Sequence, residues 1–96
     1  MYNGKIKGTG ADKMAYKFEK KLKEIIVLCG EAVDINKIDA NTDLVKDFEF
    51  SSINIIQLVV EIESIFEVEI EDENLFLEKL SNYSNLVNIL RTKLNE

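Results

Sequence analysis

The chain has 96 residues, a hydrophobic fraction of 46% and a net charge of −6, which fits one globular domain and excludes a disordered chain. It lacks histidine, which excludes an imidazole base or a His-ligated metal, and its single cysteine, Cys29, excludes an intramolecular disulfide. No apolar run approaches the roughly 18 residues of a membrane span, and the first residues lack the apolar core of a signal peptide, so we expect a cytoplasmic protein.

Charge is distributed unevenly along the chain. Residues 1–24 carry seven lysines against three acidic residues, whereas residues 52–73 carry seven acidic residues and no basic one. An acidic segment repels nucleic acid and attracts basic protein surfaces. We therefore expect protein partners and no nucleic-acid partner. The acidic run also lacks the central glycine of an EF-hand loop, so no metal site is predicted.

The first 50 residues are predicted to hold a tail, a helix and a loop. Residues 1–11 contain three of the four glycines, which predicts a flexible tail before a single domain at residues 12–96. Asp12 is placed to cap a helix over about residues 13–29, and Gly30 to end it. The inward face of this helix is predicted to be Phe18, Leu22, Ile25, Ile26 and Cys29. Weak periodicity over residues 31–50 predicts an ordered loop, anchored to the core by Val33, Ile35, Ile38 and Leu44.

A second helix is predicted over residues 52–66. The segment is apolar around much of its circumference, so it either lies centrally or presents an apolar surface to a partner. The face predicted to point toward the core comprises Ile56, Val59, Val60, Glu63 and Phe66, widened by Ile53 and Ile62. Ile55 falls on another side of the helix.

The remaining chain predicts a connector and two further helices. Residues 67–71 alternate acidic and apolar side chains, with Val68 and Ile70 inward, but have no partner strand. Asp72 is placed to cap a short helix over about residues 73–79, and Ser81 or Asn82 to open a last helix that ends near residue 94. The inward face of the last helix is predicted to be Leu86, Val87, Leu90 and Leu94. The predicted fold is all-α, a small antiparallel four-helix bundle of three longer helices and one short helix.

The segment from Asp43 to Leu75 (DLVKDFEFSSINIIQLVVEIESIFEVEIEDENL) resembles the core of acyl carrier proteins and their peptidyl carrier relatives. The shared features are acidic and apolar residues before Ser51-Ser52-Ile53, the later Ile62-Glu63 and Phe66, and the connector Val68-Glu69-Ile70. The order of predicted helices is also similar.

The resemblance implies that Ser52 receives a 4′-phosphopantetheine arm from a phosphopantetheinyl transferase. The chain would then be a monomeric carrier, not an enzyme, that holds acyl or aminoacyl groups as thioesters. Its other partners would be loading and biosynthetic enzymes. At the start of the second helix we expect Ser51 to cap the helix and Ser52 to point outward. The predicted partner-binding residues are Ser51, Ile53, Ile55, Ile56, Glu61, Glu63, Glu67 and Glu69.

The sequence departs from the family pattern around this serine. Ser51 stands where the family usually has Asp, and Glu49 where it often has Gly. Asn54 and Gln57 stand where acidic side chains are common. The missing acids favour a specialised pathway, of polyketide or nonribosomal-peptide type, with a fatty acid pathway as the alternative. The cargo stays open, because fatty acyl, polyketide, aminoacyl and D-alanyl carriers share this helix pattern.

Two other functions are weighed against the carrier. One is an unmodified helical interaction module that docks through its acidic second helix. The other is an enzyme, for which the sequence offers no nucleophile–base set, metal cluster or phosphate-binding loop. Modification of Ser52 discriminates the carrier from the interaction module.

Overall fold

The computed structural model describes residues 16–71 and 74–95. The tail at 1–11, the cap at Asp12, the first residues of the first predicted helix, and the predicted cap and start of the third helix at Asp72 and Glu73 lie outside the described residues. The described elements are α2 (Phe18–Cys29), a 3₁₀ turn η1 (Ile35–Lys37), α3 (Leu44–Phe48), α4 (Ser52–Phe66), α5 (Leu77–Leu80) and α6 (Tyr83–Leu94).

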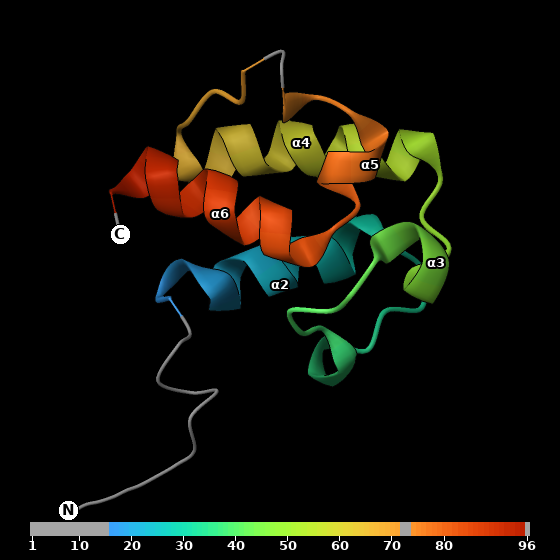
Figure 1. Cartoon of the computed structure of the whole chain (residues 1–96). Helices are drawn as coiled ribbons and strands as arrows, with labels where there is room; N and C mark the ends of the chain where they lie inside the picture. Colours follow the sequence, from blue (N-terminus) through green and yellow to red (C-terminus); the bar gives the residue numbers. More distant parts are fainter. Residues whose placement is uncertain (1–15, 72–73, 96) are drawn as a thin grey trace, which may run out of the picture.

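Three longer helices, α2, α4 and α6, pack around one core (Figure 1). Helix α2 runs in the opposite direction to α4 and α6 (Figure 1). The start of α2 and the end of α6 lie at one end of the bundle, and the first turn of α4 lies at the other end (Figure 1). The predicted all-α bundle of three longer helices and a short one is confirmed. Within the described ranges β-type pairing is limited to an isolated bridge between Asp43 and Asn82.

The core is built from one face of each long helix and from the loop anchors. In α2 and α6 the predicted inward positions are buried or partly buried, because charged side chains in α2, and mostly uncharged polar ones in α6, fill the opposite faces. Ile38 and Leu44 anchor the loop and Ile70 anchors the connector, as predicted. The buried apolar residues are Phe18, Leu22, Ile25, Ile26, Ile38, Leu44, Phe50, Ile55, Leu58, Ile62, Ile70, Leu80, Tyr83, Leu86 and Leu90.

The predicted inward face of α4 was partly wrong: Ile62, Val59 and Phe66 do face the core, but Ile53, Ile56 and Val60 do not. Ile55, Leu58 and Ile62 are buried, whereas Ile56 and Val60 are 62% and 57% exposed. Both sets have helical spacing, so an almost wholly apolar helix does not reveal which one turns inward. Burial of the first set leaves a second apolar stripe on the surface.

The loop over residues 31–50 contains one helix that the sequence did not predict, α3. Asp43 caps it by accepting hydrogen bonds from the backbone N–H groups of Val45 and Lys46, at 2.9 and 3.0 Å. The Asp47 carboxylate accepts from the N–H of Asp43 at 2.8 Å, which closes the turn reciprocally. A helix of five residues is too short to show a periodic apolar pattern.

The loop is also fixed to the α5–α6 junction. The N–H of Leu44 donates to the carbonyl of Ser81 at 2.7 Å, and the N–H of Tyr83 donates to the carbonyl of Thr42 at 3.0 Å. These bonds place α3 beside the start of α6. Among the described residues no helix combines the length and the apolar character that crossing a bilayer demands.

Candidate functional site

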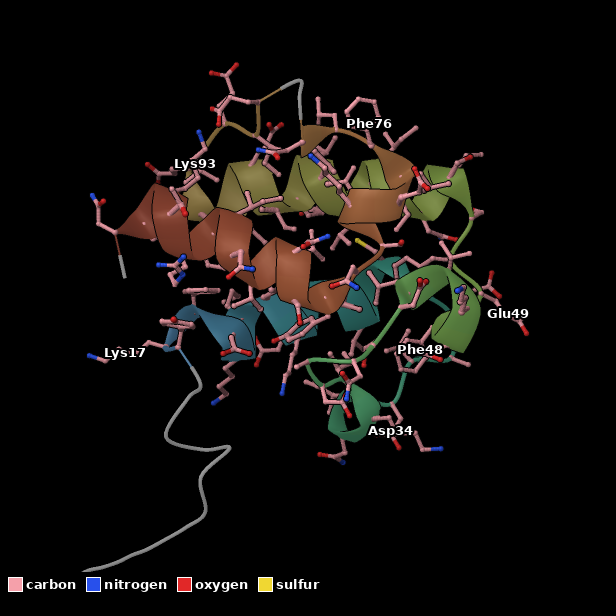
Figure 2. The ribbon with its side chains drawn as sticks, in the orientation of Figure 1. Lys17, Asp34, Phe48, Glu49, Phe76 and Lys93 are labelled. Carbon is pink, nitrogen blue, oxygen red and sulfur yellow. The ribbon has the colours of Figure 1, made fainter. Side chains whose placement is uncertain are left out.

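The approach to Ser52 is set by a sharp change of direction at the end of α3. Glu49 adopts φ 58° and ψ 36°, the left-handed conformation in which glycine is favoured. Its side chain points away from the bundle at the end of α3 (Figure 2). The next residue, Phe50, turns back into the core with 4% exposure, and its N–H donates to the carbonyl of Leu44 at 3.1 Å. Phe50 therefore anchors the chain immediately before Ser51.

Ser51 is the N-cap of α4, as predicted. Its hydroxyl accepts from the N–H of Asn54 at 3.2 Å, while the Asn54 side-chain oxygen accepts from the N–H of Ser51 at 2.8 Å. This reciprocal arrangement is a capping box, and it satisfies two donors that a helix start leaves without partners. The Ser51 hydroxyl is fully engaged, because it also donates to Oδ1 of Asn54 at 2.8 Å.

Ser52 is the first residue of α4 and is exposed to solvent. In the described part of the chain, its hydroxyl has no hydrogen-bond partner, in contrast to that of Ser51. A 15-residue helix presents unpaired N–H groups and the positive end of its dipole at this position, which favours a phosphodiester there. Ser52 therefore has the free hydroxyl and the electrostatic setting that a phosphate-linked group needs.

The first turn of α4 is joined to the end of α2. The side-chain amide of Asn54 donates to the carbonyl of Cys29 at 3.0 Å, across 25 residues of sequence. Next to Cys29, Gly30 ends α2 as predicted, with φ −96°. A Cβ built on Gly30 would lie 2.5 Å from Val33 Cγ2 and 2.6 Å from Phe50 Cε1. Glycine is needed here for this close approach, which brings Phe50 against the end of α2.

The Cys29 thiol is not poised to react beside this site. It is half-buried on α2. Burial, and to a smaller extent the negative charge of Glu61, raise the pKa of the Cys29 thiol. The thiol therefore stays protonated at neutral pH, which disfavours its use as a nucleophile.

The surface beside Ser52 is apolar. Ile53, Ile56 and Val60 are 67%, 62% and 57% exposed and follow one another along the outer side of α4. Ile55, which we predicted to contact partners, is instead a core residue with 2% exposure, because it belongs to the inward set with Leu58. Ser51, Ile53 and Ile56 are the predicted partner residues that lie exposed in the first two turns of α4.

The predicted acidic partner residues separate into exposed and structural ones. Glu61, Glu67 and Glu69 are exposed. Glu63 is half-buried, and its carboxylate accepts from the N–H of Ile70 at 2.9 Å, so it holds the extended connector against α4. Further along, the connector is tied to α6 by an ion pair between Glu71 and Lys93.

The sequence did not identify Asn54 as part of the site architecture. In the sequence, Asn54 is notable only as an uncharged residue at a position where the family commonly has an acidic one. Its bond to Cys29 could not be predicted, because it depends on how α2 and α4 pack. The spacing Ser51-x-x-Asn54 resembles a capping box, so the local sequence indicates that Asn54 can help to cap α4. It gives no indication of the bond to Cys29.

Comparison with known proteins agrees with this site. The family model for the phosphopantetheine attachment site matches residues 23–90. The acyl carrier protein of Petrotoga mobilis (strain DSM 10674 / SJ95) is 38% identical over 76 residues, which cover 79% of this chain and 86% of that protein. The chain therefore belongs to the acyl carrier protein family, whose members bear a covalent 4′-phosphopantetheine group. The expectation of a carrier rather than a catalyst is confirmed by this membership.

Proposed function

We propose that Ser52 is the attachment residue and that the chain carries acyl or aminoacyl groups in a specialised biosynthetic pathway. The observation that supports the proposal best is that the hydroxyls of two adjacent serines are used differently. Ser51 uses its hydroxyl to cap α4, whereas Ser52 presents an exposed hydroxyl with no partner among the described residues. The arm supplies a thiol that holds the cargo as a thioester.

The chain contributes a nucleophile and its setting to the attachment reaction. The Ser52 oxygen attacks the phosphorus of coenzyme A that bears the pantetheine group. The bond to the other phosphate breaks, adenosine bisphosphate leaves, and the hydroxyl proton passes to a base on the transferase. The start of α4 favours the phosphodiester through its unpaired N–H groups. No base from this chain is required, which agrees with its lack of histidine.

The surroundings of Ser52 support the choice of a specialised pathway. Asn54 and Gln57 bring no charge to the first two turns of α4, and Ile53 and Ile56 are exposed beside the serine. Partner enzymes that approach Ser52 meet an apolar surface, with the first acidic residue of α4 at Glu61. Enzymes that recognise acids next to the serine would lack their contacts, as expected if the pathway is not that of bulk fatty acids.

Partner binding is proposed at Ser51, Ile53 and Ile56, with Glu61, Glu67 and Glu69 adding electrostatic attraction at longer range. Glu63 is left out because its carboxylate holds Ile70. A monomeric state and a cytoplasmic location stay predictions.

Modification of the purified apo protein tests the attachment site. Incubation with coenzyme A and a broad-specificity phosphopantetheinyl transferase is expected to add one arm, detected by intact-mass spectrometry. Ser52→Ala is expected to abolish the addition while helical content stays nearly unchanged, since an exposed first-turn serine contributes little stability. Ser64→Ala, an exposed serine later in α4, is the matched control and should gain the arm normally.

Two results would contradict the proposal. One is an arm on the Ser52→Ala protein. The other is a wild-type protein that several transferases fail to modify, which would favour the unmodified interaction module. Intact-mass spectrometry of the protein from its native host would report the arm and the cargo together, and so identify the pathway.

A further inference from the structure

Asn54 makes two kinds of hydrogen bond with one side chain. Its oxygen accepts from the N–H and the hydroxyl of Ser51, both at 2.8 Å, and so completes the cap of α4. Its side-chain nitrogen donates to the carbonyl of Cys29 at 3.0 Å. The Cys29 carbonyl belongs to the last turn of α2, where carbonyls lack partners inside the helix. One amide therefore satisfies groups at the start of α4 and at the end of α2.

A carboxylate at residue 54 could make only the bonds of the cap and not the bond to Cys29. An ionised Asp or Glu accepts hydrogen bonds but donates none. It would keep the capping box and lose the bond to Cys29, and its negative charge would face the carbonyl oxygen. The amide at residue 54 therefore has two effects. It allows the hydrogen bond that joins α4 to α2, and it leaves the surface without the negative charge of an acidic residue.

The bond to Cys29 acts together with two packed side chains. Phe50 and Val33 lie against Gly30, one residue beyond Cys29. Phe50 precedes Ser51, and Asn54 follows it by three residues, so the segment that carries Ser52 is held to the end of α2 on both sides. Packing of Phe50 against Gly30 fixes the chain that leads to Ser51, and the hydrogen bond from Asn54 to Cys29 fixes the first turn of α4.

From this geometry we infer that Asn54 is a positioning residue for arm attachment: its amide holds the first turn of α4 on the end of α2 and thereby fixes the Ser52 hydroxyl for the transferase. The inference rests on the proposed role of Ser52. It assigns to Asn54 no contact with coenzyme A and no share in the chemistry.

Asn54→Asp isolates the bond to Cys29, because it keeps the size of the side chain and the capping oxygen. We expect kcat for arm addition to fall about five- to tenfold, since small misplacements of a reacting group are costly. The melting temperature should fall only modestly, because one hydrogen bond is lost while the cap and the packing of Phe50 are retained. Gln57→Glu is the matched control: it adds the same charge one turn later, at an exposed position that makes no hydrogen bond to Cys29 among the described residues. Any effect of that control should appear in KM and not in kcat.

Hydrogen exchange gives a readout that does not depend on the transferase. The N–H of Ile55 donates to the carbonyl of Ser51 at 3.1 Å and reports the order of the first turn. Its protection should fall in Asn54→Asp and stay at the wild-type level in Gln57→Glu.

The outcomes separate this inference from the proposed function. Asn54→Asp with wild-type kcat, or Gln57→Glu with an equal loss of kcat, would overturn the positioning role while leaving Ser52 as the attachment residue. A wild-type protein that accepts no arm would overturn the function and, with it, the role of Asn54. A lower melting temperature with unchanged kcat would identify Asn54 as a structural residue alone.

Discussion

The phenol of Tyr83 donates a hydrogen bond of 2.7 Å to Oε1 of Glu19, 64 residues earlier in the chain. The other oxygen of the same carboxylate accepts from the N–H of Tyr16 at 2.8 Å. One side chain therefore joins the start of α6 to the start of α2. Tyr83 is 2% exposed, so its hydroxyl depends on this partner.

Tyr83→Phe is expected to lower the free energy of unfolding by about 1.5–3 kcal/mol at neutral pH, the range for a hydrogen bond to a charged group. Burial first, and then the hydrogen bond and charge of Glu19, raise the pKa of Tyr83 above its usual range. Above pH about 10 the phenol therefore ionises in the unfolded chain but not in the native protein, and stability is lost as pH rises.

Urea unfolding of both proteins between about pH 8 and pH 11 measures this effect. The advantage of the wild type over Tyr83→Phe should shrink as pH rises above 10. An advantage that stays constant across this range would show that the Tyr83 pKa is the same in the folded and unfolded states.

Ser51→Ala removes the cap of α4 and should lower the free energy of unfolding by about 0.5–2 kcal/mol. It should slow arm addition without preventing it, because the hydroxyl of Ser52 is untouched. Chemical denaturation measures the first effect and intact-mass time courses measure the second. Ser64→Ala is expected to change stability by no more than about 0.5 kcal/mol. Equal losses in the two variants would argue against the cap.

Glu49→Gly should raise the free energy of unfolding by about 1 kcal/mol, because glycine adopts the left-handed conformation without the strain of a Cβ. Glu49→Ala separates this cause from the removal of charge, since alanine keeps the strain. Thermal and urea unfolding of both variants provide the comparison. If alanine stabilised the protein as much as glycine, backbone strain at residue 49 would not be the reason.

Replacing Glu61, Glu67 and Glu69 together by glutamine should slow association with a basic cognate enzyme a few-fold at low salt, because exposed charges act mainly on the association rate. The difference should vanish at about 0.5 M salt, where the Debye length is only a few ångströms. Stopped-flow binding at several ionic strengths measures it. An unchanged salt dependence in the variant would remove these acids from the partner surface.

The buried face of a helix could be predicted from the sequence where the polar and apolar faces of that helix are distinct. In α2 the lysines opposite Leu22 and Ile26 fix the inward face, and in α6 the pattern at Leu86 and Leu90 does the same. In α4 the stripe through Ile53 and Ile56 has the same spacing as the buried set, so the choice between them is made by tertiary packing. Local spacing contains no information about it.

The site was predictable to the extent that it is local. The cap at Ser51 and the outward position of Ser52 depend on neighbouring residues and were predicted. The bond from Asn54 to Cys29 and the approach of Phe50 to Gly30 join distant segments and were not. The left-handed Glu49 was visible only as a departure from a family glycine.

The arrangement of the described chain ends has a consequence for embedding this carrier in larger assemblies. The start of α2 and the end of α6 lie at the end of the bundle opposite the first turn of α4 (Figure 1). A neighbouring domain or a surface anchor joined through either end would leave the Ser52 hydroxyl facing open solvent. The same fold thus suits both a separate diffusing carrier and a module within a multidomain synthase. For binding measurements, attaching the protein to a surface through either end keeps Ser52 accessible.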